Sequence, residues 1–229
     1  MLLIRWFLNA TRVAQLATDN RIGESTVYAY LYEGIDILVA QAPDLARALG
    51  RAKEAGLSHL NLDGTVVRTD RVSTPGTNGA YLWWSGKHKH HGGNIQVLSA
   101  PGGWPLWTSG VRPGREHDTT CAKAETGLLP ALEKVATDQG LLTLTDPGYE
   151  NLSAAMWHPV KKPAGQELTH EQKACNQLIR GVHGVAEHAN SLLKTTFKAL
   201  RRVSLDPWRI GAITRAGLVL LQLEHDRTI

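Results

Sequence analysis

Three acidic residues need a common explanation, and one of them, Asp63, stands where a carboxylate is costly unless it is paired or binds a cation. Asp63 interrupts an apolar run, Asp146 follows the apolar segment 141–144, and Glu187 lies in a segment with a helical pattern. Clustered carboxylates repel one another unless divalent cations neutralise them. Oxygen-only ligands suit Mg²⁺ or Mn²⁺, and two such ions can activate water and stabilise a leaving oxygen in phosphodiester cleavage. If the three residues meet, the chemistry they predict is phosphoryl transfer.

Each carboxylate also has an ordinary structural explanation. Asp63 beside Gly64 can shape a turn, and Asp146 before a Pro-Gly pair can do the same. Glu187, among arginine and lysine residues, can be a solvated salt-bridge partner. No single one of the three establishes a catalytic site.

Strand and helix patterns indicate how these residues are positioned. Apolar segments around Asp63 and before Asp146 predict strands, and residues 81–85, 94–100 and 104–111 predict an antiparallel meander. A helix is expected to begin near Asp118, and the apolar spacing over 171–199 predicts one long helix that carries Glu187. We therefore expect an α/β fold, a mixed sheet flanked by helices.

The first 52 residues predict a small all-helical region. A short helix, a turn at residues 20–24 and a second helix capped by Ser25 have the layout of a helix-turn-helix. Two core helices joined by an ordinary turn explain the pattern equally well. We place the domain boundary here, with a catalytic domain over 53–229, and expect the helical region to be truncated at its N-terminus because the chain starts abruptly in an apolar helix.

Composition limits the classes of protein. The chain has 229 residues and a net charge of +4, which permits a nucleic-acid partner without requiring one. Cys121 and Cys175 form no CxxC pair, which favours a reducing cytoplasm. The apolar segments at the two ends are too short to cross a bilayer, so we expect a soluble protein with no membrane partner.

Five blocks between residues 60 and 203 carry a family resemblance. They are Leu62–Thr65, Ser85–Val97, Pro113–Asp118, Thr145–Tyr149, and Glu187 with Lys194. In this order they resemble the DDE-type transposases of the Harbinger and bacterial insertion-sequence group, which are DDE superfamily endonucleases. The resemblance implies an RNase H-like catalytic domain preceded by a helix-turn-helix, and metal-dependent DNA cleavage and strand transfer.

The resemblance also implies roles and partners. Asp63, Asp146 and Glu187 match the catalytic triad that would hold two Mg²⁺ or Mn²⁺ ions, and Asp118 matches a further block. Because Asp118 also reads as a helix N-cap, we expect it to support the site rather than bind metal. The implied partner is double-stranded DNA, at terminal inverted repeats and a target site, bound by a homodimer in the nucleoid of a bacterial host.

Basic residues suggest where DNA is bound. The histidines of the loop 87–91 suggest zinc, but in a basic loop flanked by glycine we interpret Lys87, Lys89 and His91 as contacts to the DNA backbone. On the helix, the candidates on the side of Glu187 are Arg180, His183 and Lys194. Four tryptophans lie on strand segments, where we expect core packing rather than base stacking: Trp83, Trp84, Trp104 and Trp107.

Two residues depart from the family pattern. His183 stands where an arginine is common, four residues before the catalytic glutamate, and Pro147 stands where a lysine is common. Histidine is largely neutral at cellular pH, so we expect a weaker nuclease than relatives with arginine. Two alternatives stay open: a catalytically impaired transposase remnant that acts only as a DNA-binding protein, and another RNase H-like nuclease that acts on RNA.

Overall fold

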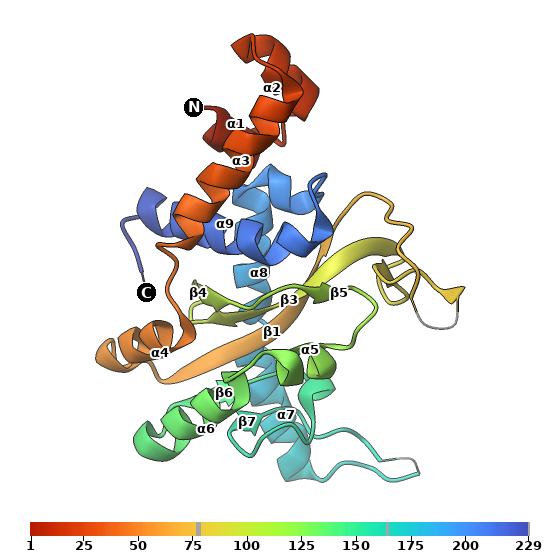
Figure 1. Ribbon diagram of the computed structural model, residues 1–229. Coiled ribbons are helices and arrows are strands. Elements are labelled where there is room, and N and C mark those ends of the chain that lie inside the picture. The colour runs from red at the N-terminus through yellow and green to blue at the C-terminus, as the bar shows by residue number, and fades with distance from the viewer. Residues whose placement is uncertain (77–78, 164, 229) are drawn as a thin grey trace.

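A mixed sheet lies at the centre of the computed structural model, which describes residues 1–76, 79–163 and 165–228 without the side chains of His183 and Ala186 (Figure 1). Its strands follow the order β2-β3-β1-β6-β7, and β4 and β5 also pair with β3. The strand bounds are β1 (His59–Arg68), β2 (Trp84–Ser85), β3 (His90–Ser99), β4 (Pro105–Thr108), β5 (Arg112–Pro113), β6 (Leu142–Leu144) and β7 (Met156–Trp157).

Helices precede, interrupt and follow these strands. The α-helices are α1 (Leu2–Asn9), α2 (Val13–Asn20), α3 (Glu24–Val39), α4 (Leu45–Glu54), α5 (Asp118–Ala124), α6 (Leu128–Gln139), α7 (His170–His183), α8 (Ala186–Thr196) and α9 (Ile210–Glu224). Short 3₁₀ turns are η2 (Pro147–Tyr149), η3 (Lys198–Arg201) and η4 (Pro207–Arg209). None of the helices in the described ranges is long and apolar enough to cross a membrane.

The sheet combines antiparallel and parallel pairing around β1. β1 pairs antiparallel with β3, with Asp63 opposite Val97, and parallel with β6, with Asn61 opposite Leu144. In Figure 1, α8 crosses behind β1, whereas α5 and α6 lie in front of the sheet. The expected α/β fold with a mixed sheet flanked by helices is confirmed. One face of the sheet is covered by α8 and the other by α5 and α6.

Glycines divide two helical segments that the apolar pattern predicts as continuous. The helix expected over 171–199 is two helices, because α7 ends at His183 with Gly184 as its C-cap, and α8 begins at Ala186. The helix expected from Asp118 onward breaks before α6, where Gly127 has a φ of 85°. Gly184 keeps a helical φ of −54°, so what it brings to the break is the cost of glycine in a helix interior, about 1 kcal/mol, whereas Gly127 takes a positive φ that glycine adopts readily.

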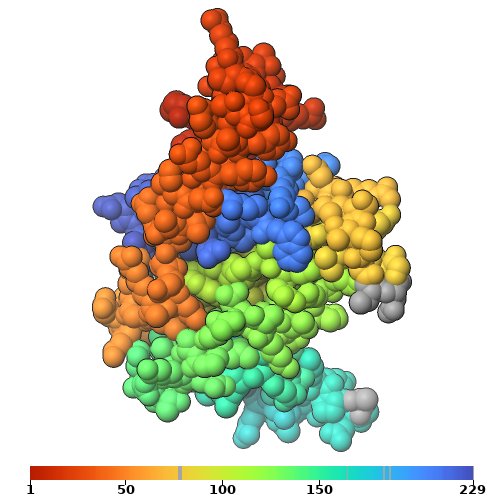
Figure 2. Space-filling view, in the orientation of Figure 1, coloured from red at the N-terminus to blue at the C-terminus, as the bar shows by residue number. Residues whose placement is uncertain are grey.

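The amino-terminal helices project from the rest of the molecule but share its core (Figure 2). Phe7 is fully buried and its ring lies 5.6 Å from that of Phe197, centroid to centroid. Asp36 on α3 forms an ion pair with Arg209, next to α9. Buried residues of α1 to α4 belong to one hydrophobic cluster with those of the sheet and α9.

The helix-turn-helix is not confirmed, although α2, a turn and α3 follow one another as expected. One side of α3 is buried through Val27, Leu31 and Ile35. Its charged residues are all acidic, namely Glu24, Glu33 and Asp36. A helix that enters the major groove of DNA normally carries basic or amide side chains. Recognition of DNA by α3 therefore stays a prediction that the charges of this helix do not favour.

The shared core predicts cooperative unfolding. Phe7→Ala should lower the free energy of unfolding of the whole chain by about 3–5 kcal/mol, because a buried aromatic ring is lost. Urea titration followed by circular dichroism and by tryptophan fluorescence should give one shifted transition. Leu8→Ala, at a site 38% exposed, is the matched control and should shift the transition much less. Two separate transitions in Phe7→Ala would instead make the amino-terminal helices an independent domain.

Candidate active site

Asp63 and Asp146 lie at the same level on neighbouring strands. The last paired residues of β1 and β6 are Asn61 and Leu144, and each aspartate stands two residues further along its strand direction. Residues two apart in a strand point to the same face. Thr145, between Leu144 and Asp146, continues the sheet by donating its N–H to the carbonyl of Trp157 at 2.9 Å. Parallel pairing thus brings together two carboxylates that are 83 residues apart in the sequence.

Helix α8 lies against the face of β1 to which Asp63 points. Asn190 donates its side-chain N–H to Asp63 Oδ2 at 2.8 Å. One turn later, Lys194 Nζ donates to Thr65 Oγ1 at 2.6 Å and to the carbonyl of Val66 at 3.1 Å. Glu187 lies three residues before Asn190 in the first turn of α8, so it occupies the same side of this helix.

The carboxylate of Asp63 is strongly perturbed. Burial raises its pKa from an ordinary 3.8 to about 7, and the charges of Asp146, Asp118 and Glu187 contribute in the same direction, in that order of size. A hydrogen bond from the backbone of Gly64 opposes them. Burial lowers the pKa of the nearby Lys194 ammonium group, and the charge of Asp63 opposes that shift. The site therefore gathers several carboxylates around Asp63 beside one buried lysine.

Asp118 approaches the same strand from the opposite face. A Cβ atom on Gly64 would lie 2.2 Å from Asp118 Oδ1, so glycine is what allows this close approach. Because neighbouring residues of a strand point to opposite faces, the Asp118 side of β1 is the side turned away from Asp63. The N-cap of α5 is His117, whereas Asp118 is its first helical residue, which corrects the expected N-cap role.

A chain of hydrogen bonds fixes Asp118. Tyr149 donates its hydroxyl proton to Gln96 Oε1, Gln96 Nε2 donates to Asn94 Oδ1 at 3.1 Å, and Asn94 Nδ2 donates to Asp118 Oδ1 at 2.7 Å. Tyr149, Gln96 and Asn94 are buried. Burial, followed by the charge of Asp118, raises the pKa of Tyr149, which keeps its hydroxyl protonated as a donor.

Sequence reasoning assigned no role to Asn94, Gln96, Tyr149 or Asn190. A signal for two of them was present, since Asn94 and Gln96 are amides two residues apart in an apolar strand and therefore share one face. No comparable signal identifies Asn190 as the partner of Asp63, because that contact depends on how α8 packs on β1.

The residues around Asp63 fit a hard divalent cation in chemical type. All the candidate donors are oxygens, and Asn190 Oδ1, on the residue that contacts Asp63, is buried without a hydrogen-bond partner. A cation would also relieve the repulsion that raises the pKa of Asp63. Within the described residues, no three His, Cys, Asp or Glu side chains are arranged closely enough to hold a metal ion as they stand. Side-chain rotation, of the exposed Glu187 above all, would have to complete the coordination.

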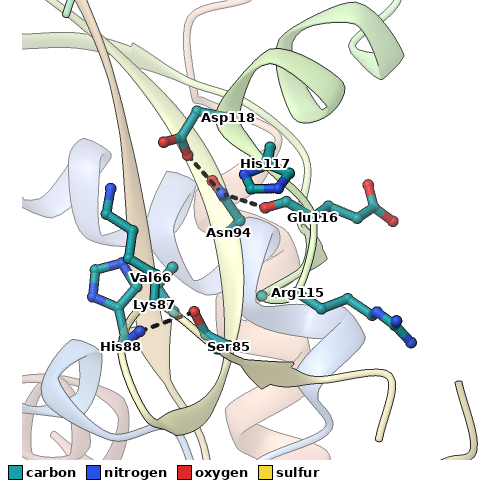
Figure 3. Close-up of a pocket in the computed structure, with 11 residues that line it drawn as sticks. Val66, Ser85, Lys87, His88, Asn94, Arg115, Glu116, His117 and Asp118 are labelled. Carbon is teal, nitrogen blue, oxygen red and sulfur yellow. Dashed lines mark hydrogen bonds between the residues drawn. The ribbon is translucent and has the colours of Figure 1, made fainter. Parts of the chain in front are cut away.

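A cavity of about 250 Å³ opens beside Asp118 (Figure 3). The loop between β2 and β3 contributes Lys87 and His88, and the segment before α5 contributes Arg115 and His117. The backbone N–H of His88 donates to Ser85 Oγ at 3.3 Å, which helps to shape the loop. The cavity therefore places Lys87 and Arg115 beside the acidic Glu116 and Asp118, and its two cationic side chains are groups that can contact a phosphate backbone.

The other candidate DNA contacts differ in how exposed their side chains are. Lys89 is exposed in the β2–β3 loop and Arg180 is exposed on α7. His91 is only 8% exposed and packs against Tyr81 and Trp84 rather than facing solvent. Lys194 is engaged with β1, as described above, and the side chain of His183 lies outside the described residues.

Two aspartates on neighbouring parallel strands, covered by a helix that carries a glutamate, are an arrangement suited in chemical type to divalent-metal chemistry. Residues 62–222 match the family described as DDE superfamily endonuclease, and the chain belongs to this family. A probable transposase for insertion sequence element IS702 from Microchaete diplosiphon is 24% identical over 198 residues, which cover 85% of this chain and 68% of that protein. No solved structure matches the chain significantly. The resemblance to DDE-type transposases is confirmed.

The raised pKa of Asp63 predicts a pH-dependent stability. The carboxyl group is neutral in both states below about pH 4, and its ionisation destabilises the fold as the pH rises toward 7. A shift of about three pH units corresponds to about 4 kcal/mol. Asp63→Asn should therefore unfold at higher urea than wild type at pH 8, with the difference vanishing near pH 4. Asp138→Asn, on the exposed side of α6, is the control. An equal difference at both pH values would contradict the prediction.

Proposed function

We propose that this protein is a DNA transposase that uses Asp63, Asp146 and Glu187 as a divalent-metal-binding triad. It binds the ends of its element, cuts phosphodiester bonds there and joins the ends to target DNA. The observation that carries this proposal is the perturbed Asp63, whose pKa is raised by burial and by the charges of Asp146, Asp118 and Glu187, the first and last of which the family resemblance assigns to the triad with it. Membership of the DDE superfamily endonucleases supports the reaction class.

Each residue has a distinct part in the proposed reaction. Asp63 on β1 and Asp146 just after the neighbouring strand β6 provide two carboxylates, and Glu187 provides an exposed carboxylate on α8 that can rotate toward them. Bound Mg²⁺ or Mn²⁺ would lower the pKa of water and stabilise charge on the leaving oxygen. Asn190 orients Asp63 through its hydrogen bond, and Lys194 holds α8 at a fixed position along β1.

Asp118 acts in this proposal as a positioning residue. It lies across β1 from Asp63, and the chain from Tyr149 through Gln96 and Asn94 holds its carboxylate in place. Its charge adds to the electrostatic demand for a cation at Asp63. Lys87, Lys89, Arg115 and Arg180 are the basic side chains that we assign to the DNA backbone, with the duplex bound by two copies of the chain.

DNA cleavage tests the triad directly. Wild type should nick a labelled duplex carrying the element's ends when Mg²⁺ or Mn²⁺ is present. Glu187→Gln should abolish nicking, because the amide loses the charge that helps to hold the metal. Glu171→Gln, an exposed glutamate on α7, is the matched control and should cut like wild type. His183→Arg should cut faster than wild type, because arginine is always cationic.

The outcomes separate the competing functions. Equal residual cutting by wild type and Glu187→Gln would place the active site elsewhere. Duplex binding without cutting by wild type and His183→Arg would favour the catalytically impaired remnant. Cutting of RNA in preference to DNA would favour the RNA nuclease.

The salt dependence of binding tests the basic cavity. Each phosphate contact that is lost should reduce the slope of log affinity against log salt concentration by about one. Lys87→Ala should therefore bind duplex DNA more weakly and with a shallower slope than wild type. Lys134→Ala, an exposed lysine on α6, should leave the slope unchanged. An unchanged slope in Lys87→Ala would remove the β2–β3 loop from the DNA interface.

A further inference from the structure

A second cavity, distinct from the one beside Asp118, is lined by aromatic rings. It has a volume of about 480 Å³, and its lining includes Tyr81, Trp84, His91 and Arg71. Trp84 and Tyr81 are 39% and 36% exposed, whereas His91 is 8% exposed and forms the floor. The expectation that Trp84 serves core packing is wrong, since its ring is among the exposed large side chains of the described residues.

The rings are arranged so that none of them covers the others. His91 meets Trp84 at an interplanar angle of 69° and Tyr81 at 47°, with centroid separations of 5.3 and 5.5 Å. These are edge and tilted contacts, which leave aromatic surface open toward the cavity. A volume of this size lies within the range of small-molecule sites. The cavity can therefore accept one flat heterocycle.

The polar residues around the cavity indicate that the ligand carries a negatively charged group as well as a flat ring. Arg71 lies over the Tyr81 ring at 5.4 Å and donates a hydrogen bond to its hydroxyl at 3.0 Å. The neighbouring acid, Asp70, is already paired with Arg202 at 2.6 Å. An apolar peptide would gain nothing from Arg71, whereas a nucleotide presents both a π-face for the rings and a phosphate for the guanidinium.

The cavity adjoins the proposed DNA surface through strand β2, which borders both cavities. Trp84 and Ser85 are consecutive residues of β2, and Ser85 lines the basic cavity beside Asp118 while Trp84 lines the aromatic one. The two cavities therefore lie on opposite faces of one short strand. Along β3, His91 is six residues from Val97, the partner of Asp63, which corresponds to roughly 20 Å at the usual rise per residue. This spans on the order of six nucleotide steps of a duplex strand.

We propose that Tyr81, Trp84 and His91, with Arg71, form a binding site for one unpaired nucleobase of the DNA on which the protein acts. This inference rests on the proposed function and adds a contact to unpaired DNA near the cleavage site. Stacking tolerates any base, because every base has a π-face, so the site recognises the unpaired state rather than a sequence. The site thus favours DNA whose strands have separated over fully paired DNA.

Binding measurements with the full chain test the proposal. The probes are a blunt duplex carrying the element's ends and the same duplex with a single-stranded tail that contains a fluorescent aminopurine. Wild type should bind the tailed duplex more tightly and quench the aminopurine. Trp84→Ala should bind the tailed duplex roughly 5- to 150-fold more weakly, with unchanged affinity for the blunt duplex. Trp84→Phe should retain most of the preference and the quenching.

Trp208→Ala is the matched control, because Trp208 is 54% exposed and lies outside this cavity. It should behave like wild type, and thermal unfolding verifies that each variant is folded. Equal affinity of wild type for both duplexes, or equal losses in Trp84→Ala and Trp208→Ala, would overturn the nucleobase site while metal-dependent nicking stands. Failure of wild type to bind or cut either duplex would overturn the proposed function and the nucleobase site together.

Discussion

The candidate site is built around the carboxylate of Asp63, which is held at a buried position that disfavours its negative charge. Asp63 sits within β1, between apolar neighbours, with its side chain turned toward α8. Parallel pairing of β1 with β6 brings Asp146 alongside, and the absence of a side chain at Gly64 lets Asp118 approach from the other face. The fold thus gathers several carboxylates around a buried position, with the buried Lys194 beside them. A site of this kind is unstable in its ionised form until a cation enters, and proteins tolerate such a cost mainly where function requires it.

Much of this arrangement was predictable from the sequence, because its signals are local. The apolar run around Asp63 and the apolar segment before Asp146 predicted that the first aspartate lies on a strand and the second at the end of one, and the helical pattern around Glu187 predicted that the glutamate lies on a helix. The prediction of one long helix was wrong because the apolar spacing continues through Gly184, and the spacing of apolar residues does not reflect the energetic cost of a glycine within a helix. His91 was expected to contact the DNA backbone, but its pairing with Trp84 across β2 and β3 leaves it only 8% exposed. Such contacts depend on register, which a single sequence does not specify.

Contacts between distant segments supply what the sequence did not. Asn190 reaches Asp63 across 127 residues, and Lys194 reaches Thr65 across 129. Both lie on α8, so the helix is attached to β1 by polar bonds as well as by apolar packing. The hydrogen-bond chain from Tyr149 to Asp118 performs the same task on the opposite face. The central strand is therefore fixed from both sides, which limits how far its carboxylate can move.

The shared core of the amino-terminal helices and the sheet has a geometric consequence. Phe7 packs on Phe197, which directly follows α8, and Asp36 is paired with Arg209 beside α9. The first helices are therefore attached through rigid packing rather than through a linker. DNA bound to these helices would lie at a fixed distance from Asp63. The number of base pairs between the bound sequence and the cleaved bond would then be set by the fold, and a variant with a weakened Phe7 contact would cleave at less uniform positions.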